Sequence, residues 1–424
     1  MREQRDGAFE NISLPEGVSL REVGGSLPIM SFSTGKRILL WGLPVALLVI
    51  AGAVLVYLVL ARSATSSPRT HKANEDPTGF TLQHVMIVHR HGLRAPSHLS
   101  NWSNPDDYPM GVGYLTKLGK QGSLRVGEIL RRFYGNFLTY SPREVWARSS
   151  TYPRCYETEY LLLGTLYPPR SFWDFGLSVQ PIPITMVPNG NDVLIESCTA
   201  SVPGDFKYMY NETHRELQED GFETFGDFME WLAENSGWST ENSEFYEPII
   251  DALYAQKYNG LHVPEWAEAK WKSMDWALRR LSFDYWKLSV PYYGQYMGKM
   301  IANRTLGSAE GSHRNRLSIM SYHDTSIQAI LSALKFDHVA MYPSFLGALH
   351  FQLYKRDSDG EFYVRSIYSR GFTACGDYRD ASQITIQDCP FPDCTLKKFV
   401  AVMNGLYPDT NRSSCPPIDL KALL

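Results

Sequence analysis

The sequence lacks an excess of positive charge. Among its 424 residues, 41 are Lys or Arg and 45 are Asp or Glu, which gives a net charge of −4. Proteins that bind a nucleic acid backbone carry a clustered basic excess, so nucleic acid is not an expected partner. Hydrophobic residues make up 44% of the chain and aromatic residues 13%. A disordered chain is poor in both classes, so the composition predicts a globular protein.

Motifs for metal ions and nucleotide cofactors are also missing. The sequence has no CxxC pair, no two histidines at i and i+4 with a carboxylate, and no Walker-type loop. We interpret Asp106-Asp107, Asp357 and Asp359 as solvated turn carboxylates. The sequence therefore predicts neither a metal site nor a cofactor.

One long uncharged run stands out near the N-terminus. Residues 38–61 contain no charge, and 24 residues at about 1.5 Å each exceed the roughly 30 Å hydrocarbon core of a bilayer. A cleaved signal peptide has a shorter apolar region nearer the start of the chain. We therefore predict a retained transmembrane signal anchor at 38–61, a disordered cytosolic tail at 1–37 and a polar stalk at 62–79.

The residues after this run carry features of an oxidising compartment. Four N-glycosylation sequons follow it, at Asn101, Asn211, Asn303 and Asn411. All six cysteines follow it too, at positions 155, 198, 375, 389, 394 and 415. Several sequons and an even number of cysteines favour a lumenal or extracellular location. We expect a single-pass type II membrane protein whose larger part faces the lumen of the lysosome or Golgi or the cell exterior.

Strand and helix patterns alternate through most of this larger part. We expect strands at 80–88, 144–149 and 316–322. We expect a helix at 115–133 with Thr116 as its N-cap, a second helix that includes residues 161–163, and a third at 327–334. Alternation of this kind predicts an α/β core with a mainly parallel sheet that helices cover on both faces.

Two segments depart from the alternation. The segments 347–354 and 361–368 flank the turn sequence KRDSDG, which predicts a hairpin near the sheet edge. Residues 201–305 contain aromatic-rich helical stretches, which we assign to a helical cap inserted into a core of residues 80–200 and 306–424.

The first candidate site directly follows the strand at 80–88. It is the sequence His89-Arg90-His91-Gly92-Leu93-Arg94-Ala95-Pro96. Arg90 and Arg94 suit a tetrahedral dianion, because each guanidinium offers a planar fork of donors. Their positive charges should disfavour protonation of His91, so its ring can stay neutral and nucleophilic.

Two further candidates also follow predicted strands. His323 and Asp324 in Ser321-Tyr322-His323-Asp324-Thr325 lie where a strand ends and a helix begins, and helix N-termini favour anions. Arg148 lies at the end of the strand at 144–149, in VWARSSTYPRC. The carboxyl ends of parallel strands share one edge of a sheet, so we expect these side chains to meet.

The pattern RHG-x-R-x-P fixes five residues, and a random chain of this length shows it about once in ten thousand. Here the sequence resembles the histidine acid phosphatases, the branch of the histidine phosphatase superfamily that contains the lysosomal and prostatic types. The resemblance implies that His91 attacks phosphorus and carries a phosphohistidine, while Arg90 and Arg94 bind phosphate. The segment SYHDT is similar to the family's SAHDTT, which implies that His323 binds phosphate and Asp324 is the general acid.

The resemblance extends to the third site and to the cysteines. RSSTYPRC is similar to the family's RSTDVDRT, from which we assign Arg148 as the third phosphate-binding arginine and Arg154 as structural. The closing segments imply the disulfides Cys389–Cys394 and Cys198–Cys415. Cys155 and Cys375 are extra relative to the family, while a cysteine that the family carries in the cap is absent. The two extra cysteines form either a further bridge or a pair of buried reduced thiols.

The resemblance implies a phosphomonoester hydrolase with an acidic optimum, whose partners are a small phosphomonoester substrate and, through 38–61, the lipid bilayer. A second copy of the chain, in a homodimer, is a further possible partner. Two alternatives stay open: an inositol-phosphate or glycan phosphatase of the same superfamily, and a non-catalytic membrane-tethered glycoprotein of this fold. Acidic cap sequences such as RELQED favour a substrate that carries less charge than an inositol polyphosphate.

Overall fold

A computed structural model describes residues 76–169, 179–188, 191–192, 194, 210–238, 246–336, 341–371 and 382–406, without the side chains of 246–248 and 281–295. These residues belong to one compact unit, 69–424. The predicted tail, the predicted span at 38–61 and nearly all of the stalk lie outside the described residues. Among the helices that are described, none combines the length and the apolar character that a bilayer span needs.

The elements alternate largely as the sequence predicts. In chain order they are β1 (Phe80–Arg90), η1 (Pro105–Asp107), α2 (Lys117–Phe133), η2 (Pro142–Glu144), β2 (Val145–Ser149), α3 (Pro153–Leu166), β3 (Ile184–Met186), α4 (Arg215–Glu219), α5 (Phe225–Ser236), α6 (Tyr246–Tyr258), α7 (Glu265–Ala269), α8 (Trp271–Ala309), β4 (Leu317–Tyr322), α9 (Asp324–Ala333), β5 (Ala348–Arg356), β6 (Phe362–Ser369), β7 (Ser382–Ile384) and α10 (Leu396–Asn404). Thr116 caps α2 as predicted, because its side chain accepts a hydrogen bond from the Gly119 amide.

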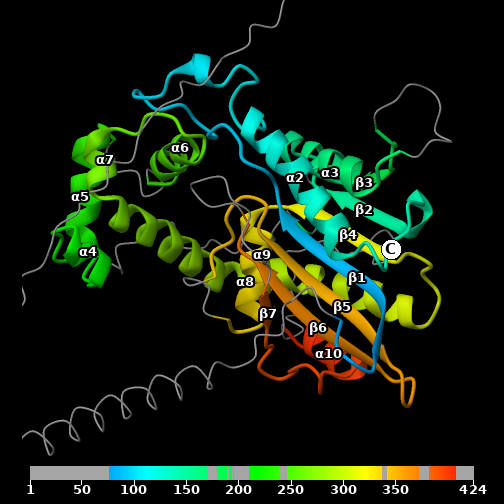
Figure 1. The fold of residues 1–424 in the computed structure, drawn as a ribbon. Coiled ribbons are helices and arrows are strands. Elements are labelled where there is room, and N and C mark those ends of the chain that lie inside the picture. The colour runs from blue at the N-terminus through cyan, green and yellow to red at the C-terminus, as the bar shows by residue number, and fades with distance from the viewer. Residues whose placement is uncertain are drawn as a thin grey trace, which may run out of the picture. The chain divides into compact units, whose positions relative to one another are not determined.

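The described strands form one seven-stranded sheet in the order β3-β2-β4-β1-β5-β6-β7 (Figure 1). Neighbours among β3, β2, β4 and β1 pair in parallel, whereas β5, β6 and β7 add antiparallel pairs. The sheet is therefore mixed rather than mainly parallel. The reason is the path of the chain: β5 starts beside His89, at the carboxyl end of β1, so it must run back along β1.

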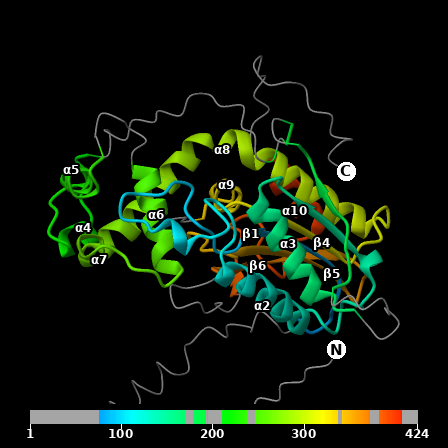
Figure 2. The same ribbon diagram turned by 90° about the horizontal axis from the view of Figure 1, so that it is seen from above.

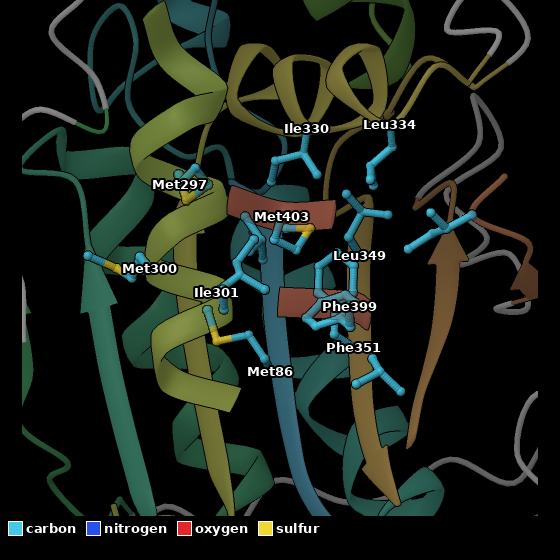
Figure 3. Close-up of a cluster of buried hydrophobic side chains, with 14 of the residues drawn as sticks. Met86, Met297, Met300, Ile301, Ile330, Leu334, Leu349, Phe351, Phe399 and Met403 are labelled. Atoms are coloured by element: carbon cyan, nitrogen blue, oxygen red, sulfur yellow. The ribbon is translucent and has the colours of Figure 1, made fainter. Parts of the chain in front are cut away.

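Helices cover both faces of this sheet (Figure 2). On one face, α2 and α3 pack their apolar side chains against residues of β1 and β4 such as Ile87 and Ile319. On the other face, α8, α9 and α10 bury a second cluster that includes Met86, Ile301, Phe351 and Phe399 (Figure 3). The central strands are apolar on both sides, as a covered sheet requires.

The predicted cap region has an apolar cluster of its own. Side chains from α4, α5, α6, α7 and the start of α8 gather around Phe225, Phe228 and Trp276. Helix α8 is 39 residues long, and its later residues, such as Ile301, pack on the sheet. One helix therefore belongs both to the cap cluster and to the sheet's covering layer.

Candidate active site

Three strand ends meet at one edge of the sheet. In the parallel register, Arg90 of β1 lies opposite Tyr322 of β4, and Ser149 of β2 lies opposite Ser321. The chain segments that leave these strands therefore start side by side. They carry the candidate residues His91, Arg94, His323 and Asp324, whereas Arg90 is the last residue of β1 and Arg148 lies within β2.

His91 is the first residue after β1 and is almost fully buried. Its Nδ1 lies 2.8 Å from the carbonyl oxygen of Gly92. A carbonyl only accepts hydrogen bonds, so Nδ1 carries the proton in this contact and the lone pair of the neutral ring is on Nε2. Burial and the charges of Arg154, Arg90 and Arg94 hold the pKa of His91 well below its usual 6.5. The ring therefore stays neutral even in mildly acidic solution, which is the form of histidine that can act as a nucleophile.

His323 lies close to His91, as the sequence predicts. The two ring centroids are 5.7 Å apart, although the residues are far apart along the chain. Nε2 of His323 is 3.2 Å from the hydroxyl of Ser150, and burial, followed by the charge of Arg154, lowers the pKa of His323 to about 3. His323 is therefore also neutral and can donate a hydrogen bond to a bound anion.

Asp324 is the first residue of α9. Its Oδ2 accepts a hydrogen bond of 2.9 Å from the Tyr342 hydroxyl and lies 3.1 Å from Nη2 of Arg90. Burial acts to raise the pKa of Asp324, but Arg90 and the Tyr342 hydroxyl together hold it below its usual value. A dianion bound beside this carboxyl group would raise the pKa again, because like charges disfavour ionisation.

The two arginines of the first motif are buried and partly paired. Arg90 donates to the carbonyl of Pro343 at 2.9 Å and packs 4.2 Å from the Phe345 ring centre. Arg94 makes a two-pronged ion pair with Asp251, at 2.8 and 3.1 Å. These contacts fix both guanidinium groups at the edge where His91 lies.

Arg148 does not join this group. It lies within β2 opposite Met320, whose side chain packs on the α8 face of the sheet. Its guanidinium donates to the Tyr322 hydroxyl and to Asp192, both at 2.8 Å, and all three side chains are buried. The prediction that Arg148 binds phosphate is therefore not supported by its placement, since its donors already serve a structural ion pair on the other side of β2.

Arg154 fits the phosphate-binding role that the sequence analysis assigned to Arg148. It lies in the first turn of α3, and its charge is the strongest of those that depress the pKa values of His91 and His323. Burial and the charge of Arg94 lower its own pKa. Its guanidinium lies 4.5 Å from the Tyr152 ring centre. We therefore propose Arg154, and not Arg148, as the third arginine of the site.

The three arginines share one further property. In the described part of the chain, the buried Nε atoms of Arg90, Arg94 and Arg154 have no hydrogen-bond partner. A buried donor without a protein partner is costly, so such a group usually bonds to a ligand, an ion or water. Three such donors, together with two neutral histidines, are chemically suited to a compact, highly charged anion.

Changing Arg154 to alanine and changing Arg148 to alanine are expected to have opposite effects on phosphate binding and stability. Arg154→Ala should weaken the binding of inorganic phosphate by about 10- to 100-fold and leave the free energy of unfolding almost unchanged, since hydrogen bonds to charged groups contribute about 1.5–3 kcal/mol. Arg148→Ala should lower the free energy of unfolding by about 3–5 kcal/mol, because it leaves Asp192 buried without its cation.

Isothermal titration calorimetry with phosphate measures the affinity of each variant, and unfolding in urea measures its stability. The same loss of phosphate affinity in folded Arg148→Ala, with none in Arg154→Ala, would restore the original assignment.

Several contacts hold α3 and the strand ends in register. The Gly92 amide donates to Thr158 Oγ1 at 2.8 Å, and Nε2 of His89 lies 2.6 Å from a carboxylate oxygen of Glu159. Gly92 also approaches α2 closely: a Cβ there would lie 2.8 Å from Ser123 Oγ. The motif therefore needs glycine for packing, and α3 carries Arg154 at a defined position relative to His91.

Residues that the sequence analysis did not identify complete the site. Asp251 comes from α6, in the predicted cap region, and Tyr342 comes from the segment before β5. Neither residue belongs to a recognisable motif. Arg154 did have a signal: Pro153 marks a helix start, so the next residue lies in the first turn after a strand end.

The cysteine and sequon predictions have separate outcomes. The disulfide Cys389–Cys394 is confirmed. Cys155 is a free, buried thiol whose pKa is raised by burial to about 11, whereas Cys375 and the predicted bridge Cys198–Cys415 lie outside the described residues.

Asn101, Asn211 and Asn303 are exposed, as glycosylation requires, and Asn411 lies outside the described residues. Among described residues, no group of three or more His, Cys, Asp or Glu side chains is arranged to hold a metal ion.

Comparisons with known proteins identify the family to which the sequence is similar. The model of the histidine phosphatase superfamily (branch 2) matches residues 81–369. Lysosomal acid phosphatase of Bos taurus is 28% identical over 378 residues, which cover 86% of this chain and 85% of the relative. Prostatic acid phosphatase of Bos taurus is 27% identical over 339 residues, with 76% and 84% covered.

Solved structures share the fold. The phytase of Hafnia alvei in complex with tartrate superposes with a TM-score of 0.54 at 17% identity, covering 79% of this chain and 99% of the phytase. The phytase of Klebsiella sp. ASR1 gives a TM-score of 0.53 at 15% identity, with 81% and 99% covered.

Proposed function

The chain belongs to the histidine phosphatase superfamily (branch 2) and is a phosphomonoester hydrolase, and we propose that it transfers the phosphoryl group to Nε2 of His91. The observation that supports this step most strongly is the convergence of a neutral His91 with buried, unsatisfied donors of three arginines. Arg90, Arg94 and Arg154, together with His323, would bind the phosphoryl oxygens.

The reaction then takes two steps. Nε2 of His91 forms a bond to phosphorus while the bond from phosphorus to the ester oxygen breaks, and protonated Asp324 gives its proton to that oxygen. In the second step a water oxygen forms a bond to phosphorus while the bond from phosphorus to Nε2 of His91 breaks and its electron pair returns to the ring. The carboxylate of Asp324 takes a proton from the water, and phosphate leaves. Asp324 can hold its proton in the first step because the bound dianion raises the pKa that Arg90 otherwise lowers.

A direct test follows the release of phosphate by the full-length chain. We expect hydrolysis of p-nitrophenyl phosphate and of alkyl phosphates at pH 5, with competitive inhibition by inorganic phosphate. Absence of hydrolysis by the folded chain over the range from pH 4 to 8 would refute the proposed function.

The pH profile should reflect the low pKa of His91. Protonation removes the nucleophile, so activity is retained down to pH values well below 6.5 and falls only where His91 titrates. Arg154→Gln removes a nearby positive charge, so it should raise the pKa of His91 and move the acidic limb of kcat/KM to higher pH. The kcat/KM profile is measured from pH 3 to 8 and corrected for the ionisation of the substrate. A wild-type acidic limb near pH 6.5, or a limb that Arg154→Gln leaves in place, would contradict the assignment.

Location and assembly complete the proposal. The acid phosphatase relatives support a lumenal or secreted location. We propose that residues 38–61 anchor the chain in a membrane and that Asn101, Asn211, Asn303 and Asn411 are glycosylated, on the sequence alone. The homodimer considered above stays a prediction.

A further inference from the structure

A buried hydrogen-bonded pair joins β1 to α3 beside the proposed nucleophile. His89 is the second residue before His91, and Glu159 lies in α3; both side chains are almost fully buried. Nε2 of His89 lies 2.6 Å from Glu159 Oε2, and Nδ1 of His89 lies 3.1 Å from the carbonyl oxygen of Arg90. The pair therefore reaches the peptide bond that links Arg90 to His91.

The pair carries no net charge. A carbonyl only accepts hydrogen bonds, so Nδ1 of His89 is protonated and donates to Arg90. The short contact between His89 and Glu159 then holds one further proton, on the ring or on the carboxyl group, and the pair is neutral as a whole in either arrangement. Burial raises the pKa of Glu159, although His89 acts against this shift. The pair therefore adds no charge behind the arginines, and its effect on the site is geometric.

The peptide bonds on both sides of the His91 Cα atom are held. The N–H of His91 donates to the Tyr322 carbonyl at 3.0 Å, while the oxygen of the same peptide bond is the one that accepts from His89. In the next peptide bond, the Gly92 N–H donates to Thr158 Oγ1 at 2.8 Å. Each residue has only two soft backbone dihedrals, so two fixed peptide planes set the direction of the His91 side chain.

Consecutive residues of α3 supply two of these contacts. Thr158 binds the peptide bond after His91, and Glu159 acts through His89 on the peptide bond before it. The same helix carries Arg154 one turn earlier, where its carbonyl accepts a hydrogen bond of 2.6 Å from Thr158 Oγ1. Helix α3 therefore fixes the backbone of His91 and that of Arg154 relative to each other.

Stability alone does not account for a buried pair of this kind. Removing two ionisable groups from water is expensive, and replacing both with apolar residues of similar volume is often neutral or stabilising. Oε1 of Glu159 is also buried without a hydrogen-bond partner in the described part of the chain, which adds to the cost. The contact of this pair with the peptide bond before His91 therefore needs a reason other than stability.

We propose that Glu159, acting through His89, is a positioning residue of the hydrolase that directs the His91 ring toward phosphorus. This inference rests on the proposed function, because it requires His91 to be the nucleophile. The pair acts on the backbone and not on the substrate, so the arginines bind the phosphoryl group whether or not the pair is present. Loss of the pair then lowers kcat and leaves phosphate affinity nearly unchanged.

The test removes the pair from the full-length chain in two ways. Glu159→Leu should lower kcat for p-nitrophenyl phosphate by about 10- to 100-fold, and change the dissociation constant of inorganic phosphate by less than about threefold, because a small displacement of a reacting group costs rate rather than phosphate contacts. The double variant His89→Leu/Glu159→Leu should show the same loss of kcat, with a free energy of unfolding at or above that of the wild type.

The conservative variant separates geometry from ionisation. In Glu159→Gln an amide N–H can donate to Nε2 of His89, which leaves Nδ1 donating to Arg90, so kcat should stay within about threefold of the wild-type value.

A matched control is His84→Leu. His84 is a buried histidine of the same strand, seven residues before His91, and its Nε2 lies 3.0 Å from Ser318 Oγ. This variant also loses a buried hydrogen bond, so it should be less stable than the wild type while kcat changes by less than about twofold.

Wild-type kcat in the folded double variant would overturn the inference, and so would a double variant that does not fold, because the pair would then be structural. An equal loss of kcat in Glu159→Gln and Glu159→Leu would also overturn it, since the ionisable carboxyl group itself would be required. A loss of phosphate affinity as large as the loss of kcat would show that the whole site had collapsed. The proposed function fails separately, if the wild-type chain hydrolyses no phosphomonoester.

Discussion

Changing His91 to alanine is expected to lower kcat by about 10⁴-fold or more. The arginines of the proposed site should still bind the substrate, but the proposed nucleophile is then missing. His323 cannot replace it, because its Nε2 already contacts the Ser150 hydroxyl and it approaches from the other strand end. Steady-state turnover of p-nitrophenyl phosphate by the purified full-length variant measures the effect.

The control for this experiment is His98→Ala. His98 is exposed and lies in the same loop as His91, so its loss should change kcat by less than about twofold. Binding of inorganic phosphate by His91→Ala shows whether the variant keeps the site. A folded His91→Ala variant that retains wild-type turnover would exclude His91 as the nucleophile.

Changing Asp324 to asparagine is expected to have an effect that depends on the leaving group. General acid catalysis contributes about 10²- to 10⁴-fold, and it matters most when the alcohol is a poor leaving group. We expect a loss of this size in kcat for an alkyl phosphate such as glycerol 2-phosphate, and a loss of about tenfold or less for p-nitrophenyl phosphate. Parallel kinetics on the two substrates measure the difference.

Tyr342→Phe is the informative companion variant. It keeps the carboxyl group but removes the hydrogen bond that Asp324 accepts from Tyr342. Loss of that bond should raise the pKa of Asp324, so the alkaline limb of the kcat profile should move to higher pH. Equal losses on both substrates in Asp324→Asn would show that Asp324 positions the phosphate rather than donating a proton.

Much of this site could be predicted from sequence because its residues follow strand ends. His91, His323 and Asp324 each come directly after a buried strand, and parallel pairing then requires them to meet. The side-chain contacts that tune them could not be predicted in the same way. Asp251 reaches Arg94 only because of how α6 lies against the motif loop, and no local pattern encodes that placement.

The placement of Arg148 away from the candidate site has a physical origin. RSSTYPRC contains two arginines six positions apart, and the sequence analysis assigned phosphate binding to the one at the strand end and a structural role to the other. Side chains alternate between the faces of a strand, and Ala147 packs on the α2–α3 face, so Arg148 must point to the opposite face. Arg154 lies beyond the strand, in the first turn of α3, and its guanidinium packs on Tyr152, whose ring lies 5.2 Å from that of His323.

The mixed sheet also could not be predicted from local sequence patterns. The turn sequence at 355–360 correctly predicts a hairpin, which the structure contains as β5 and β6. Its position beside β1 depends on Leu346, whose amide donates to the His91 carbonyl at 3.1 Å and brings the chain back to the end of β1. That long-range contact has no counterpart in local periodicity.

The most direct measurement is to trap the phosphoryl-enzyme. The full-length chain is mixed with p-nitrophenyl phosphate, quenched within one turnover, and digested under alkaline conditions that preserve a phosphohistidine. Mass spectrometry should then find one phosphoryl group on His91, absent from His91→Ala and increased in Asp324→Asn with a good leaving group, because hydrolysis of the intermediate slows. A phosphoryl group on another residue, or full turnover with none on the protein, would contradict a nucleophilic His91.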